Sequence, residues 1–230
     1  FVVWAHHMFT VGMPIAGELY FMYATMLIAV PTGVKVFNWI TTMYRGSLTF
    51  ETPMLFSIAF VILFTFGGFT GMMLSIAAAD MQYHDTYFVV AHFHYVMVAG
   101  AVFSGTAAVY YWLPKWCGRM YDETMGKVQF WIAFIGFNIT FMPQHFLGLA
   151  GMPRRYADYG LQFADWNMVS SIGAFMYGGA QILFLFNVIR TIGWGKPTDD
   201  PQVWEGAEGL EWTVPTPAPY HTFATPPKVK

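Results

Sequence analysis

Five long apolar stretches restrict this sequence to a membrane-spanning helical fold. They run at about Ile15–Met43, Thr52–Leu74, Tyr87–Trp116, Glu123–Leu149 and Phe163–Ile192. Roughly 20 apolar residues suffice for a helix to cross the hydrocarbon core of a bilayer. Only 10% of the 230 residues are charged, whereas soluble domains carry about 25%. The chain is therefore predicted to be an all-α integral membrane protein, a bundle of about five transmembrane helices.

The basic residues outside these stretches predict how the bundle is oriented. One side receives Arg45, Lys115, Arg119, Lys127, Arg190 and Lys196, and the other receives only Arg154 and Arg155. Because cytoplasmic loops carry the excess of Lys and Arg, the first side is expected to face the cytoplasm or its equivalent. From residue 196 onward prolines and polar residues accumulate. We expect a transmembrane region at 1–195 and a cytoplasmic tail without helical structure at 196–230.

Other features exclude some functions and suggest that the sequence is incomplete. The net charge of −2 gives no sign of nucleic-acid binding, and the single Cys117 cannot form an internal disulfide. The sequence opens inside an apolar run without a basic leader, so we expect a piece of a longer protein. Gly67 and Gly71 lie four residues apart in the second stretch and predict a close contact between helices.

Two histidines lie in the middle of the third stretch, in the segment VAHFHY at residues 90–95. Two positions along a helix correspond to a rotation of roughly 200°, so His92 and His94 should point to opposite sides of one rod. Ionisable groups inside a membrane are costly and usually functional. The pair predicts one helix between two prosthetic groups, each ligated by one histidine. The alternative is a pair of core histidines hydrogen-bonded to neighbouring helices.

Two further polar pairs lie at the outer ends of the stretches. Adjacent imidazoles suit copper, zinc or iron, but His6 and His7 can reach one metal only if the backbone there is irregular, and a third ligand must come from elsewhere. His84 and Asp85 suit a divalent cation if a partner supplies more oxygen atoms. The alternative for His84 and Asp85 is a surface histidine beside a helix-capping aspartate.

Three more basic residues need an explanation. The adjacent Arg154 and Arg155 predict an anionic ligand, because guanidinium groups bind carboxylates bidentately; anchoring to lipid phosphate is the alternative. Lys35 lies deep in the first stretch, where a charge costs at least about 2.5–3.5 kcal/mol. Thr32 lies three residues before Lys35 and shares its face. The two predict a route for protons or ions, with snorkelling of Lys35 to the inner interface as the alternative.

Six segments resemble signatures of one family, the catalytic subunit (subunit I) of heme–copper terminal oxidases of the cytochrome c oxidase kind. They are WAHHMFTVGM at 4–13, PTGVK at 31–35, HDTY at 84–87, AHFHY at 91–95, PQHFLG at 143–148 and GMPRR at 151–155. They follow the order of the family and cover nearly the whole chain. The resemblance implies the C-terminal part of a twelve-helix subunit.

The resemblance also implies a role for each candidate residue. It makes His6 and His7 ligands of the copper in the binuclear centre, His92 the ligand of the high-spin heme iron and His94 a ligand of the low-spin heme iron. It places Arg154, Arg155 and Asp80 at the heme propionates, His84 and Asp85 at a magnesium ion, and Thr32 and Lys35 on a proton path from the inner side. The third copper ligand, its cross-linked tyrosine and the second low-spin heme ligand are implied on earlier helices, so this stretch alone is not expected to be active.

The function implied by the resemblance is proton-pumping reduction of O2 to water, with electrons passing from reduced cytochrome c through the low-spin heme to the high-spin heme and copper. The implied cofactors are two hemes of the A type, copper and magnesium. The implied partners are oxidase subunits II and III, cytochrome c through subunit II, and the lipids of a bacterial inner membrane, or of the mitochondrial inner membrane in a eukaryote.

Three alternatives remain. A quinol oxidase of the same superfamily is disfavoured because quinol-using relatives tend to have Asn where this chain has Asp85 and Tyr95. A non-enzymatic b-type cytochrome leaves His6 and His7 without a use. A cation transporter would account for Lys35 but leaves the pair formed by His92 and His94 unexplained.

Overall fold

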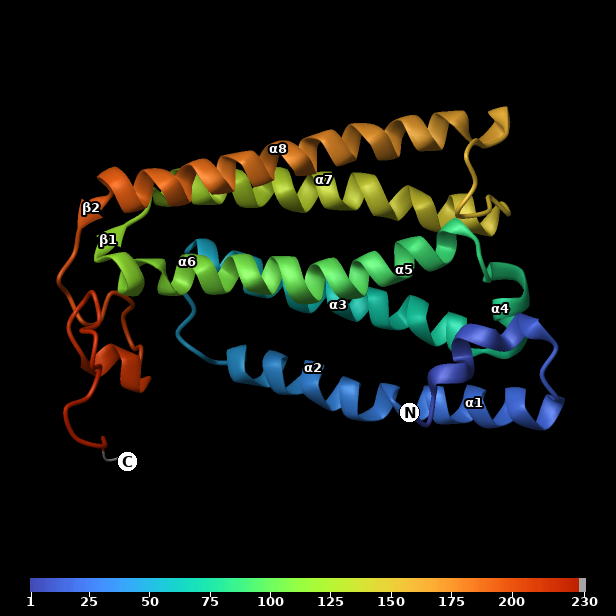
Figure 1. Ribbon diagram of the computed structural model, residues 1–230, viewed down its shortest axis with the longest axis horizontal. Helices are drawn as coiled ribbons and strands as arrows, with labels where there is room; N and C mark the ends of the chain where they lie inside the picture. The colour runs from blue at the N-terminus through green and yellow to red at the C-terminus, as the bar shows by residue number, and fades with distance from the viewer. Residues whose placement is uncertain (228–230) are drawn as a thin grey trace.

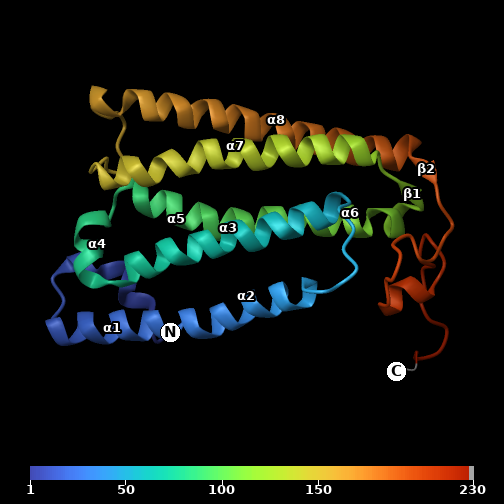
Figure 2. The ribbon, with the colours of Figure 1, turned by 180° about the vertical axis from the view of Figure 1, so that it is seen from behind.

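A computed structural model describes residues 1–227 as a bundle of elongated helical rods, five of them long and apolar enough to cross a membrane (Figures 1 and 2). The rods are α1 (Ile15–Leu27) with α2 (Ala29–Met43), α3 (Thr52–Ser75), α5 (Tyr87–Met97) with the π-helical η2 (Val98–Phe103) and α6 (Ser104–Cys117), α7 (Glu123–Leu149), and α8 (Ala164–Trp194). The predicted all-α membrane fold and its five spans are confirmed.

Short elements close the two ends of the bundle (Figure 1). One end holds two 3-10 helices and a short α-helix: η1 (Trp4–Val11), α4 (Ala77–Tyr83) and η3 (Leu161–Phe163). At the other end, β1 (Arg119–Met120) pairs antiparallel with β2 (Lys196–Pro197), and the tail contains the 3-10 helix η4 (Leu210–Thr213). The segments assigned to the cytoplasmic side thus meet at the end opposite α4.

The core lies between α3, the α5–α6 rod, α7 and α8. Buried aromatic rings fill it, among them Phe56, Phe103 and Phe137. Glycines bring the helices together: a Cβ atom at Gly173 of α8 would lie 2.5 Å from the backbone nitrogen of Thr140 on α7. Close backbone approach through small residues is typical of helices packed in membranes, and α7 and α8 run side by side in both views (Figures 1 and 2).

The first rod differs from the others because it is broken and lies at the edge of the bundle. The break falls at Ile28, between the end of α1 at Leu27 and the start of α2 at Ala29, three residues before Pro31. Proline has no N–H group to donate to the carbonyl of Leu27, four residues earlier, so the helix bends there. No residue of α1 or α2 is buried among residues 1–227. Lys35 of α2 therefore lies at the edge of the bundle and is exposed.

The tail packs against α6, and the expectation that it lacks helical structure is wrong at η4. Lys115 of α6 is only 3% exposed. Its Nζ atom donates to the carbonyl oxygens of Val214 at 2.6 Å and Pro201 at 3.4 Å, and to Oγ1 of Thr216 at 3.1 Å. A buried ammonium group must have acceptors for its protons, and the tail folds back to supply them. Proline content and polarity alone could not reveal this partner on α6.

Replacing Lys115 with methionine is expected to release the tail. The substitution keeps the length of the side chain but removes the donor that holds three tail oxygens, which should weaken docking by about 1–3 kcal/mol. Chymotrypsin, which does not cut at lysine, should then cleave the tail near Trp204 and Trp212 faster in the detergent-solubilised protein. Lys127→Met is the control, because Lys127 forms only an exposed ion pair with Glu123 at 3.5 Å. Equal cleavage in both variants would contradict the prediction.

Candidate functional site

One end of the bundle gathers most of the residues singled out from the sequence. It combines η1, α4, the first turns of α5 and the segment after α7 (Figure 1). His6 lies close enough to His7 and to His92 of α5 that their charges add to the effect of burial in lowering the pKa of His6. Imidazoles from two separate elements, η1 and α5, therefore lie near each other at this end.

The two adjacent histidines of η1 converge on one point. Their Nε2 atoms lie 3.1 Å apart, so both can be about 2.0 Å from a single metal ion. The expected irregular backbone is present: η1 is a 3-10 helix, and Met8 within it has φ −131° and ψ 20°. The hydroxyl of Thr25 donates its proton to the carbonyl of Phe21 at 2.5 Å, so it accepts from Nδ1 of His6 at 3.2 Å. Nε2 of His6 is consequently unprotonated and accepts from Nε2–H of His7 at 3.1 Å, so its lone pair points to where a shared metal ion would lie.

The histidines of α5 point to different helices, as their spacing predicts. Nδ1 of His92 lies 2.9 Å from the carbonyl oxygen of Gly67 on α3. Nδ1 of His94 lies 2.7 Å from the carbonyl of Val90, and its ring stacks on Phe141 of α7 with centroids 4.2 Å apart. Because a carbonyl oxygen only accepts, each Nδ1 carries the proton and each Nε2 is left with a lone pair. Both imidazoles are in the state that binds iron.

Asp80, His84 and Asp85 form a chain of polar contacts at the same end of the bundle. Nδ1 of His84 donates to Oδ2 of Asp80 at 3.0 Å, and Nε2 of His84 lies 3.8 Å from Oδ2 of Asp85. Asp80 is 4% exposed; burial raises the pKa of its carboxyl, while the hydrogen bond from His84 opposes that shift. Within residues 1–227 no three His, Cys, Asp or Glu side chains are arranged to hold a metal ion.

Arg154 and Arg155 both contact Asp85. Nε of Arg154 lies 3.4 Å and Nη1 of Arg155 3.7 Å from Oδ1 of Asp85. The backbone brings them there, since the N–H of Arg154 donates to the carbonyl of Asp85 at 2.8 Å and Thr86 forms a β-bridge with Pro153. Sequence reasoning assigned the arginines and the aspartate to separate ligands and did not foresee this contact.

The contact between Asp80 and His84 was also missed. Residues 75–86 lie between two of the predicted spans and were assigned no helix, but they contain the helix α4. The spacing of Asp80 and His84 was visible in the sequence, and residues four apart on a helix are neighbours. The helix itself could not be recognised, however, because the apolar run before Asp80 is too short to show a helical periodicity.

Thr32 and Lys35 lie away from the histidine cluster. Lys35 is exposed on α2, with its Nζ atom 5.9 Å from the ring centroid of Trp39, and the hydroxyl of Thr32 donates to the carbonyl of Ile28. Within residues 1–227 no polar cavity encloses Lys35. The described segments therefore do not form polar surroundings around this lysine.

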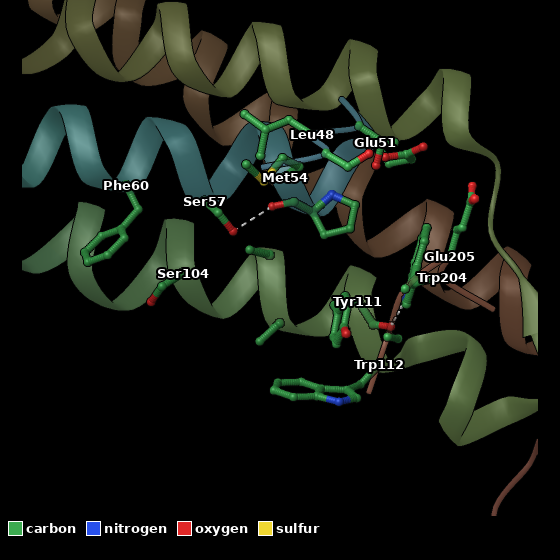
Figure 3. Close-up of a pocket in the computed structure, with 17 residues that line it drawn as sticks. Leu48, Glu51, Met54, Ser57, Phe60, Ser104, Tyr111, Trp112, Trp204 and Glu205 are labelled. Atoms are coloured by element: carbon green, nitrogen blue, oxygen red, sulfur yellow. Dashed lines mark hydrogen bonds between the residues drawn. The ribbon is translucent and has the colours of Figure 1, made fainter. Parts of the chain in front are cut away.

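A cavity of about 480 Å³ lies at the opposite end of the bundle, between α3, α6 and the tail. Figure 3 shows Ser57, Ser104, Tyr111 and Trp204 on its wall, where the indole nitrogen of Trp204 donates to the carbonyl of Tyr111 at 2.8 Å. None of the residues singled out from the sequence lines this cavity.

Comparisons with known proteins identify the family and the fold of the chain. The model of the family described as Cytochrome C and Quinol oxidase polypeptide I matches residues 1–176. Cytochrome c oxidase subunit 1 of Cereibacter sphaeroides is 54% identical over 99% of this chain and 40% of its own length, and that of Bacillus sp. (strain PS3) is 53% identical over 100% of this chain and 38% of its own. A chain of a heme-copper terminal oxidase dimer superposes with a TM-score of 0.74 at 18% identity, covering 84% of this chain and 40% of that one; this likeness shows the fold alone.

The five apolar spans place the chain in the class of multi-pass helical membrane proteins. Within that class, it belongs to the cytochrome c and quinol oxidase polypeptide I family, the heme–copper oxidases. The chain spans about 40% of the length of the curated relatives it matches.

Proposed function

We propose that this chain is part of the catalytic subunit of a terminal oxidase that passes electrons from reduced cytochrome c to O2, forming water and moving protons across a bacterial inner membrane. The observation that carries the proposal is the set of imidazoles with an unprotonated Nε2 on His6, His92 and His94, with the Nε2 atoms of His6 and His7 3.1 Å apart. The proposal concerns the longer protein, with subunits II and III as its partners.

The histidines fit the metal groups of the family. Nε2 of His92 would hold the high-spin heme and Nε2 of His94 the low-spin heme, while His6 and His7 would hold copper. When bound, the hemes, of the A type, and the copper supply electron transfer and reduction of O2. The protein fixes the tautomers through the carbonyls of Gly67 and Val90, and holds both heme ligands on one helix. These hydrogen bonds also raise the basicity of the ligand nitrogens.

The charged residues beside the histidines suit the remaining roles. Arg154 and Arg155 would pair with heme propionates, with Asp80 close by, because guanidinium groups bind carboxylates strongly and in a defined orientation. Both arginines lie within 4 Å of Asp85, and a propionate would compete with that carboxylate. His84 and Asp85 would hold magnesium, with the remaining oxygen ligands coming from a partner subunit or water.

Thr32 and Lys35 would carry protons from the inner side. A charge at the depth of Lys35 costs at least about 2.5–3.5 kcal/mol, and supplying protons to a site that gains negative charge is a function that offsets this cost. Thr32 and Lys35 share one face of α2, on which Thr32 is half-buried and Lys35 is exposed among the described residues. The rest of the longer protein would enclose that face.

A quinol oxidase of the same superfamily is the second candidate, because the matching family description names both electron donors. Two relatives more than 50% identical are described as cytochrome c oxidase subunits, and Asp85 and Tyr95 favour the same assignment. A purified complete oxidase that turns over with quinol and not with reduced cytochrome c would reverse this preference.

Metal analysis of the complete oxidase tests the proposal. His6→Ala and His7→Ala should each lower copper by one equivalent per binuclear centre, because each removes one of two converging ligands, while reduced-minus-oxidised spectra still show both hemes. Carbon monoxide should bind one heme in the parent protein. Full copper in both variants, or one heme only in the parent, would overturn the assignment.

A further inference from the structure

The segment of α3 from Gly67 to Gly71 lies directly against His92. A Cβ atom at Gly71 would lie 2.7 Å from Cε1 of His92, and one at Gly67 would lie 2.9 Å from Cγ2 of Val96. A side chain at either position would force the two helices apart. The glycines thus let the backbone of α3 reach the imidazole, and the spacing predicted to bring helices together does so here.

Thr70, within this segment, is a second contact of the same nitrogen. The side chain is 6% exposed, and its Oγ1 atom lies 3.2 Å from Nδ1 of His92. The hydroxyl donates its own proton to the carbonyl of Gly67 at 2.9 Å. Because the hydroxyl proton is used in the hydrogen bond to Gly67, Oγ1 can only accept a hydrogen bond from His92. The N–H group of His92 is therefore shared between the carbonyl of Gly67 and the hydroxyl of Thr70.

The three groups can all be satisfied at once. A carbonyl oxygen has two lone pairs, so Gly67 accepts from both His92 and Thr70 without losing either bond. A hydroxyl that donates to a carbonyl becomes a better acceptor, because linked hydrogen bonds polarise one another. The hydroxyl consequently adds to the pull on the Nδ1 proton, and more electron density remains on Nε2.

We propose that Thr70 of α3 is a positioning residue for His92 of α5. Its hydroxyl fixes the angle at which the imidazole of His92 packs against α3, and it makes Nε2 of His92 a stronger ligand. This inference rests on the proposed function, in which Nε2 of His92 holds the high-spin heme iron. It predicts that the strength of the iron–imidazole bond depends on a hydroxyl that touches neither the iron nor the heme ligand nitrogen.

The test is resonance Raman spectroscopy of the reduced high-spin heme in the complete oxidase. Thr70→Val removes the hydroxyl and keeps the shape, so the iron–imidazole stretching band should move to lower frequency at unchanged heme content. Thr70→Ser keeps the hydroxyl and should return the band to the parent position. Thr65→Val is the matched control, because the hydroxyl of Thr65 on the same helix bonds only to the carbonyl of Val61; its band should not move.

The outcomes separate this inference from the proposed function. A band at the parent frequency in Thr70→Val, or equal shifts in Thr70→Val and Thr65→Val, would overturn the role of Thr70. If Thr70→Val does not retain heme, Thr70→Cys decides, since sulfur is a weak acceptor and should shift the band the same way by less. An iron–imidazole band that survives in His92→Gly would instead refute the ligand assignment itself.

Discussion

Replacing His92 with alanine is expected to abolish the carbon-monoxide-reactive heme signal of the complete oxidase, whereas His94→Ala should remove the low-spin heme first. The two imidazoles leave α5 toward α3 and toward α7, so each substitution should affect one heme. Changes at residues that only support a metal ligand typically cost 10–100-fold in affinity, and loss of the ligand itself should cost more. Reduced-minus-oxidised spectra with and without carbon monoxide measure both effects.

Each of these variants is the control for the other. Both remove one imidazole from the same helix, with similar loss of packing, so a general defect in folding would reduce both heme signals together. Selective loss in opposite directions is what ligation of two separate hemes requires. If either variant retained both heme spectra, the assignment of that histidine would be wrong.

The fold could be predicted because only helices and closed β-barrels satisfy all their backbone hydrogen bonds inside a membrane. The spans Ile15–Met43 and Glu123–Leu149 have the predicted bounds, and the other three differ from prediction by one or two residues at an end. Two irregularities were not foreseen: the break at Ile28 and the π-helical turn at Val98–Phe103. The break follows from Pro31, whose missing N–H group the lengths of the apolar stretches do not register. The π-helical turn depends on how individual carbonyl groups are satisfied by neighbouring helices, and hydrophobic length carries no information about that.

The site was predictable as a set of residues but not as a set of contacts. Spacing alone gave the opposite directions of His92 and His94. The sequence did not reveal that Nδ1 of His92 meets α3 at Gly67 and Thr70, because partners 22 and 25 residues away depend on the register of two packed helices. The contact of Asp85 with the arginines was hidden for the same reason.

Lys35→Met should slow O2 reduction severely while leaving heme spectra and copper content near those of the parent protein. Lys35 is exposed on α2, and among residues 1–227 its neighbour is the ring of Trp39 at 5.9 Å, so the substitution removes no metal ligand and no buried contact. Methionine has similar length and no charge, and removing a charge from the membrane should if anything favour folding. Oxygen uptake with reduced cytochrome c as donor measures the effect.

Because Lys35 is exposed on α2, this result distinguishes a lysine that carries protons from one that only snorkels to the membrane interface. A lysine that feeds protons must be enclosed by helices of the longer protein, so its removal stops turnover. A lysine that only snorkels to the interface can be replaced without loss. Thr32→Ala should slow turnover more mildly, because water can replace a hydroxyl in a proton chain. Lys127→Met, which removes an exposed lysine at 3.5 Å from Glu123, should turn over at the parent rate. If Lys35→Met does the same, the lysine carries no protons.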